Sequence, residues 1–167
     1  GKFDLVHEMM PHYDEPKSGP KGDVDMNEYP IILTTGRRIP VYFHSEHRQL
    51  PWCRELWPAP RLEVNPEDAA ELGLEQGDWA WIETEWGKVR QCVDLYYGIA
   101  KGWANAEHAW WFPELPAPTH GFELSNIECI WNPYGQDPFI GSSHMRGVPV
   151  KIYKATPENC PDGKVIP

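Results

Sequence analysis

Proline is the residue type that most constrains how this chain can fold, because eighteen prolines interrupt its 167 residues. A proline lacks the backbone N–H donor and breaks both helix interiors and central strands. The apolar segments between the prolines are short, and none approaches the roughly eighteen residues that span a bilayer. The sequence therefore predicts a mainly β fold, a barrel or sandwich of six or seven short strands with one or two short helices.

Apolar runs bounded by turn-forming residues mark the expected strands. They are residues 29–35, 61–65, 79–85, 88–97, a short segment within 98–114, and 148–155. The clearest helix signal is NPEDAAELGLEQGD at 65–78, where Asn65 can cap the N-terminus and Pro66 suits the first helical position. Gly73 or Gly77 can end this helix with a left-handed residue.

Composition divides the chain into three stretches. Residues 1–28 lack periodicity and are rich in proline, glycine and acids, which is typical of an extended arm or linker. Residues 29–155 contain all the expected strands and are predicted to form one domain, and residues 156–167 form a C-terminal tail. Because the chain begins with glycine rather than methionine, we expect it to be a piece of a larger protein.

The charge is negative overall but its arginines are clustered. A formal net charge of −10 argues against nonspecific binding to nucleic acid or to an anionic membrane. Five of the seven arginines nevertheless fall between residues 37 and 61, directly after the first expected strand. A local cation cluster in an acidic chain indicates either a site for a specific anionic ligand or a solvated basic loop.

The four cysteines, Cys53, Cys92, Cys129 and Cys160, stand more than thirty residues apart. Metal sites made of cysteine usually use closely spaced pairs, and no CxxC or CxxH pair occurs here. We therefore expect no metal site built from this chain alone, and we expect the thiols to be buried and reduced.

The segment LTTGRR after the first strand has the chemistry of an anion-binding turn. A glycine lets the backbone approach a ligand and turns successive N–H groups toward an anion, while threonine hydroxyls and arginine add donors. The candidate ligand-binding residues of this segment are Thr34, Thr35, Gly36, Arg37, His44, Ser45 and Arg48. The alternative is a solvated basic loop paired with local acids such as Glu46 and Glu55.

Four segments in order resemble one known domain. They are YPIILTTGRRIPVYFHSEHRQLP, LEVNPEDAAELGLEQGDWAWIETEWGKVRQCV, GIAKGWANAEHAWWFPE and GSSHMRGVPVKIYK. Their order and spacing resemble the molybdopterin dinucleotide-binding domain of the dimethyl sulfoxide reductase family of molybdenum and tungsten enzymes. The resemblance covers about residues 29–155 and implies a double-psi β-barrel of the aspartate decarboxylase-like type. It also implies a molybdopterin guanine dinucleotide cofactor carrying molybdenum or tungsten.

The resemblance places cofactor contacts in three regions. The first is the basic segment described above, and the second is EHAWWFPE, where His108 can hydrogen-bond the ligand and Trp110 and Trp111 either stack on a flat ring or belong to the core. The third is the late segment SNIECIWNPYGQDPFIGSSHMRG, which departs from the usual Asn-x-Leu-Thr pattern, with Glu128 and Trp131 at the apparent places of Asn and Thr. The candidates there are Asn126, Asn132, Asp137 and Arg146.

The expected function is that of a cofactor-binding domain in a larger oxidoreductase. The resemblance implies no complete active site in this chain, so the isolated domain is predicted to be inactive and free of metal. Its expected partners are the preceding catalytic domains of the same polypeptide and, in some enzymes of this kind, an iron–sulfur electron-transfer subunit. The segments look closest to anaerobic members, among them acetylene hydratase-like and hydroxyarene-processing enzymes. The compartment depends on whether a preceding segment carries an export signal.

Three rival functions fit parts of the same sequence. A double-psi barrel also serves as a protein-interaction or substrate-recognition module, which does not need the arginine cluster. Nine tryptophans suggest a carbohydrate-binding module, but Trp79 and Trp81 alternate as core residues do. A pyruvoyl-dependent decarboxylase needs a self-processing Gly-Ser step, and Gly141-Ser142 lies in a late loop instead.

Overall fold

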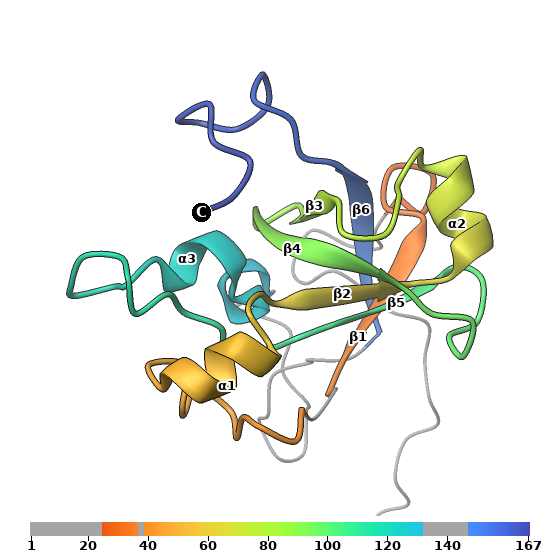
Figure 1. Ribbon diagram of the computed structural model, residues 1–167. Helices are drawn as coiled ribbons and strands as arrows, with labels where there is room; N and C mark the ends of the chain where they lie inside the picture. Colours follow the sequence, from red (N-terminus) through yellow and green to blue (C-terminus); the bar gives the residue numbers. More distant parts are fainter. Residues whose placement is uncertain (1–24, 37–38, 132–146) are drawn as a thin grey trace, which may run out of the picture.

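A computed structural model describes residues 25–36, 39–131 and 147–167 of the chain. Its strands form one closed barrel in the order β1-β5-β2-β4-β3-β6 (Figure 1). The strands are β1 (Ile31–Thr35), β2 (Arg61–Val64), β3 (Trp79–Thr84), β4 (Gly87–Leu95), β5 (Trp103–Ala106) and β6 (Val148–Lys154). The mainly β, double-psi barrel fold predicted from the sequence is confirmed, and each expected strand is present within a few residues of its predicted bounds.

Two parallel pairings decide where the ends of the strands meet. β1 runs parallel to β5, with Thr34 opposite Asn105 and Thr35 opposite Ala106. β2 runs parallel to β4, and the remaining neighbours are antiparallel. Because parallel strands end at the same edge of a sheet, the segments that follow β1 and β5 start side by side. These are the two segments that the sequence singled out for ligand binding.

The barrel interior is filled by inward-facing aliphatic side chains. The fully buried members include Leu33, Leu62, Val64, Ile82, Val89 and Val150. A second apolar cluster lies outside the barrel and is rich in aromatic residues. It joins Tyr42, Trp79, Trp81, Trp110 and Phe112. Two apolar layers therefore hold the loops to the barrel.

The helices are short and lie at two ends of the barrel. α2 (Pro66–Glu71) is the predicted helix, with the Asn65 side chain accepting a hydrogen bond from the Glu67 N–H at 2.9 Å. It ends just before Gly73, one of the two glycines expected to end it, which adopts a left-handed conformation (φ 67°). α1 (Pro51–Leu56), α3 (Phe122–Ser125) and the 3-10 helix η2 (Ile127–Ile130) were not predicted. α1 and α3 lie together at one end, and α2 lies at the other (Figure 1).

The segment after β6 folds back against the barrel (Figure 1). Arg90 of β4, which is only 2% exposed, donates hydrogen bonds to the carbonyls of Lys164 and Val165. The Trp81 indole donates to the Asn159 side chain at 2.8 Å. In the described parts of the chain, no helix has the length and apolar character needed to cross a membrane.

Candidate functional site

The site begins where β1 ends. Thr34 and Thr35 are half-buried at the end of the strand, and Gly36 is exposed directly after them. Gly36 adopts φ 131°, a conformation that side-chain-bearing residues rarely take. Its backbone is therefore open to a ligand at the edge shared with β5. Arg37, the next predicted contact, lies outside the described residues.

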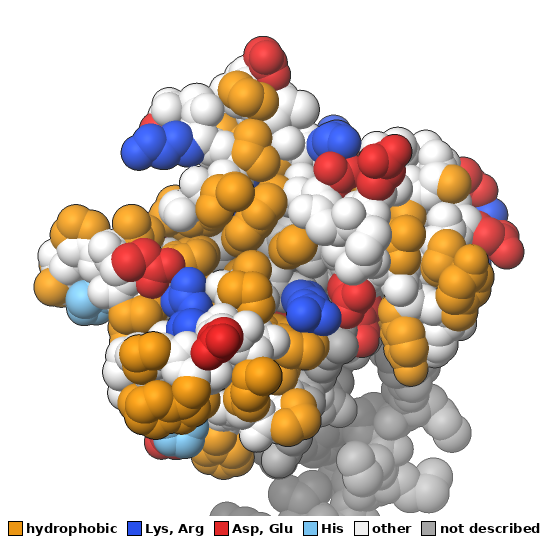
Figure 2. Space-filling model, viewed as in Figure 1, with side chains coloured by type: hydrophobic (Ala, Val, Ile, Leu, Met, Phe, Trp, Pro, Cys, Tyr) orange, Lys and Arg blue, Asp and Glu red, His pale blue; other side chains and the backbone are white. Residues whose placement is uncertain are grey.

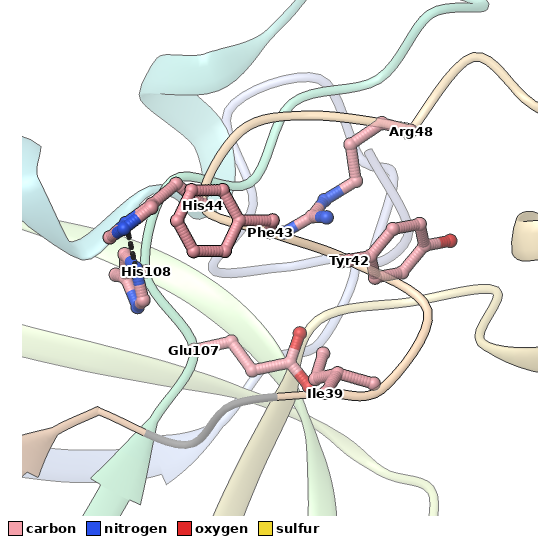
Figure 3. A pocket seen from close by; sticks show the side chains of 7 residues that line it. All are labelled: Ile39, Tyr42, Phe43, His44, Arg48, Glu107 and His108. Carbon is pink, nitrogen blue, oxygen red and sulfur yellow. Dashed lines mark hydrogen bonds between the residues drawn. The ribbon is translucent and has the colours of Figure 1, made fainter.

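Two histidines join the segments that follow β1 and β5. His44 Nδ1 lies 3.0 Å from His108 Nε2, although the residues are 64 positions apart in sequence (Figure 3). A neutral imidazole has one donor and one acceptor nitrogen, so the pair is satisfied when one ring donates to the other. Both rings line a small cavity of about 40 Å³ with Arg48 and Glu107. The structure thus brings together His44 and His108, both predicted contacts.

Arg48 lines the same cavity as the histidine pair. Its guanidinium carbon is 3.9 Å from the ring centroid of Tyr42 and 4.5 Å from that of Trp110. The side chain is only 2% exposed, and burial lowers the pKa of Arg48 to about 10 against the opposing effect of Glu107. Arg48 lines the cavity (Figure 3), but most of its surface is buried against other side chains of the protein.

Glu107 is a site residue that the sequence reasoning missed. It directly follows β5, is 1% exposed, and accepts a hydrogen bond from the Trp57 indole at 2.6 Å. A buried carboxylate near a buried guanidinium compensates part of the desolvation cost of both groups. The only sequence signal for Glu107 is an acidic residue directly before His108, and nothing local distinguishes it from a solvated acid.

A larger open hollow of about 490 Å³ adjoins the histidine pair. Its walls include Ser45, Trp111, His120, Phe122 and Asn126. The Trp111 indole donates a hydrogen bond to the Ser45 carbonyl at 2.6 Å, which fixes this ring against the segment that follows β1.

The neighbouring tryptophans of the second segment have different surroundings. Trp110 is fully buried in the outer apolar cluster, as the core alternative expected. Trp111 is half-buried and forms part of the wall of the hollow. Only Trp111 is therefore placed where a flat ring could stack on it without the core being opened.

Asn126 connects the second segment with η2. Its side-chain oxygen accepts hydrogen bonds from the Ala109 N–H at 2.9 Å and from the Glu128 N–H at 3.3 Å. Of the other late candidates, Asn132, Asp137 and Arg146 lie outside the described residues. Glu128, at the apparent place of the usual asparagine, is exposed at the rim of the hollow.

Strained backbone is concentrated around the site. Among the described residues, four that are not glycine have positive φ, namely His44 (50°), His47 (71°), Ala109 (56°) and His120 (48°). His44, His47 and Ala109 belong to the two segments that meet at the β1–β5 edge, and His120 lines the adjoining hollow. Such conformations cost of order 1–3 kcal/mol each and gather at functional sites.

Apolar side chains are exposed beside the site. Phe43, Trp52 and Leu56 are 55%, 62% and 66% exposed, and the last two lie one turn apart on α1. Figure 2 shows hydrophobic side chains gathered over this end of the molecule. Large exposed apolar side chains are unusual on a protein surface, so these three are noted as candidates for a contact surface.

No group of three or more His, Cys, Asp or Glu side chains is arranged to hold a metal ion within the ranges that the structure covers. The four cysteines are free, and Cys53 and Cys160 are buried as expected. Cys129 is exposed, so the expectation of burial was wrong for this thiol. Its place on the short, surface-lying η2 explains the difference.

The residues present fit a ligand that combines phosphates with flat rings. The exposed backbone at Gly36 and the threonine hydroxyls suit phosphate oxygens, and imidazole nitrogens suit a polar heterocycle. The hollow walled by Trp111 adds room for a planar group. A dinucleotide with a fused-ring system has this combination of groups.

Comparison with known proteins agrees with this donor set. Residues 31–132 match the family of the molydopterin dinucleotide binding domain. The chain belongs to this family. The predicted family and the predicted molybdopterin dinucleotide cofactor are confirmed.

Two relatives and one solved structure show how much of a longer protein this domain represents. The chain is 58% identical, over 95% of its length, to dopamine dehydroxylase from Eggerthella lenta, of which it covers 16%. It is 31% identical to acetylene hydratase from Syntrophotalea acetylenica, with 90% of the chain covering 22% of that protein. The structure of acetylene hydratase from Pelobacter acetylenicus matches with a TM-score of 0.78 and 29% identity, over 87% of this chain and 21% of that one. The matched relatives are therefore several times longer than this chain.

Proposed function

We propose that this chain holds the molybdopterin guanine dinucleotide of a larger molybdenum or tungsten oxidoreductase at the edge where β1 and β5 end. The observation that carries the proposal is the contact between His44 and His108, which joins the two ligand-binding segments directly. The family match supports the choice of cofactor, and the contact between the two segments supports this location for it.

Each part of the site has a role in holding the cofactor. The Gly36 backbone and the hydroxyls of Thr34 and Thr35 bind the diphosphate, with Arg37 as the cation that pairs with it. His108, steadied by His44, hydrogen-bonds the pterin end, and Trp111 presents its ring to a planar group. When bound, the cofactor supplies the two-electron redox chemistry, and these residues supply orientation and electrostatics.

We further propose that the parent enzyme removes a hydroxyl group from an aromatic ring. The support is the 58% identity to dopamine dehydroxylase across nearly the whole chain, well above the 31% to acetylene hydratase. In such a reaction two electrons and two protons replace the hydroxyl by hydrogen and release water. The substrate and the electron donor, an iron–sulfur subunit among the candidates, bind elsewhere in the longer protein.

The exposed apolar surface of Phe43, Trp52 and Leu56 is proposed to contact the preceding catalytic domains of the same polypeptide. Relatives that are several times longer supply the protein that would cover it. The surface borders the histidine pair, because Phe43 packs edge-on against His44 with ring centroids 4.5 Å apart. Such a contact closes the cofactor site against water.

The cofactor site is tested in the full-length protein with His108→Ala and, as a control, Tyr97→Ala. Tyr97 is 86% exposed in the turn after β4, away from the site. We expect His108→Ala to lower the molybdenum or tungsten content, and the GMP released by acid hydrolysis, at least tenfold. The control should keep both at the wild-type level. Wild-type metal and GMP content in both His108→Ala and His44→Ala would refute the placement of the cofactor.

The reaction is tested separately with the loaded wild-type protein. Catechol-bearing amines are supplied with a reduced viologen dye, and loss of one ring hydroxyl is followed by mass spectrometry. Consumption of acetylene without dehydroxylation would instead favour a hydratase, while leaving the cofactor site unaffected.

A further inference from the structure

Gln91 is a polar residue in an apolar row. It lies in β4 between Val89 and Val93, whose side chains fill the barrel interior, and it is 0% exposed. Burial of an amide is costly unless its donors and acceptor are paired. The Gln91 amide is therefore expected to form hydrogen bonds that a valine or leucine at this position could not form.

The Gln91 amide grips the backbone directly after β5. Its oxygen accepts from the Glu107 N–H at 3.1 Å, and its nitrogen donates to the Glu107 carbonyl at 2.7 Å. The same nitrogen donates to the Ser125 carbonyl at 3.0 Å, at the end of α3. One side chain thus fixes the residue before His108 and ties it to the helix that precedes Asn126.

Asn126 completes the arrangement from the other side. Its oxygen accepts from the Ala109 N–H at 2.9 Å, so the residue after His108 is also held by a side-chain amide. Ala109 has a φ of 56°, a strained conformation that persists only when its surroundings enforce it. His108 is therefore clamped on both flanks and points out toward His44.

We propose that Gln91 and Asn126 are positioning residues whose two amides form a cradle that presents the imidazole of His108 to the cofactor. The inference rests on the proposed function, because it takes His108 as a cofactor contact. It assigns Asn126 an indirect role in place of the direct contact expected from the sequence. It also assigns a role to Gln91, a residue that the sequence reasoning did not select.

The experiment uses the full-length protein, four new variants and the His108→Ala variant introduced above. Gln91→Met and Asn126→Leu keep the side-chain size and remove the hydrogen bonds, while Asn126→Asp keeps the oxygen that both backbone N–H groups use. Gln76→Met is the control, because Gln76 also bridges two groups, Asp94 and the Leu95 N–H, but on the exposed side of the barrel. Amide hydrogen exchange by mass spectrometry, metal content and melting temperature are measured for each.

The cradle predicts a specific pattern. In protein freed of cofactor, Gln91→Met and Asn126→Leu speed exchange in peptides covering 107–109 at least tenfold, while peptides covering β3 stay at the wild-type rate. Their metal content falls at least fivefold, and Asn126→Asp and Gln76→Met stay within twofold of wild type on both measures.

Three results would count against it. A uniform rise in exchange over the whole barrel would reduce Gln91 to an ordinary stability residue. Asn126→Asp with slow exchange but lost metal would mean that the Asn126 amide nitrogen contacts the cofactor directly. Fast exchange at 107–109 with unchanged metal in His108→Ala as well would overturn the role of His108, and with it the proposed site, while supporting the hydrogen bonds of the cradle.

Discussion

The guanidinium group of Arg48 shows what a sequence can and cannot say about one residue. The clustering of arginines pointed to this segment as a ligand site, and Arg48 does line the cavity beside the histidine pair. The sequence could not show that Arg48 is enclosed between Tyr42 and Trp110, because those rings come from distant parts of the chain. An arginine side chain in a loop can point toward a ligand or into the protein, and packing decides which.

This enclosure makes Arg48 important for stability. Arg48→Lys is expected to lower the free energy of unfolding by about 2 kcal/mol. A lysine ammonium is not planar, so it cannot stack on the two rings as the guanidinium does, and it is harder to desolvate. Arg54→Lys is the comparison, since Arg54 lies farther from an aromatic ring, 5.5 Å from the Trp110 centroid, and pairs with the half-exposed Glu114 at 2.8 Å. Such exposed pairs contribute about 1 kcal/mol or less. Urea denaturation of both variants measures the difference. Equal losses would show that the aromatic enclosure contributes little.

At the scale of elements, local signals worked where they were strong. The strands were predicted from the short apolar runs between turn-forming residues. α2 was predicted from the Asn65 cap and from Pro66 at the first helical position. α1 was missed because it has no side-chain cap at Leu50, whereas Asn65 caps α2 of the same length. The sequence does contain a signal for Gln91, because this polar residue lies between two valines at the inward-facing positions of a predicted strand. A polar residue at such a position indicates a buried hydrogen-bonding role.

The turn between α2 and β3 gives a prediction about pH. Asp78 pairs with Lys154 of β6 at 2.8 Å and accepts from the Glu75 N–H at 2.8 Å. Partial burial raises the pKa of Asp78, but these bonds outweigh it and hold the pKa below its ordinary value of 3.8. The ionised carboxylate therefore stabilises the fold above pH 3.8, and this contribution is lost as the pH falls through the lowered pKa.

Asp78→Asn should accordingly lose its stability difference from wild type in acid. At pH 7 we expect wild type to be more stable by at most about 1 kcal/mol, since the pair is partly exposed. Urea midpoints measured from pH 7 down to pH 2.5 should converge below pH 3.8. The exposed Glu85→Gln serves as control, and a gap that stays constant to pH 2.5 would contradict the assigned role.

At the scale of the whole molecule, topology assembles the site. His44 and His108 meet because β1 and β5 run parallel and end together, a fact of barrel closure that no local pattern contains. The sequence pattern alone allowed either a barrel or a sandwich. Only the resemblance to a known family predicted that the strands close into a barrel. The burial of Trp110 and the partial exposure of Trp111 could not be predicted for the same reason. Adjacent loop residues point in different directions, and only the tertiary fold decides which of them is buried.

The C-terminal segment offers the test at this scale. Residues 156–167 cover the outer face of β3 and β4, where Arg90 binds the carbonyls of Lys164 and Val165 and Trp81 binds Asn159. A chain ending at Ala155 would expose Trp81 and hydrate Arg90, at a cost of about 3 kcal/mol for the indole alone. Removal of residues 166–167, which leaves all these contacts in place, is the control. Chemical denaturation should show a loss of that size for the long deletion and nearly none for the short one, together with a red shift of tryptophan emission. If both deletions unfold at the wild-type midpoint, the barrel is complete without the segment.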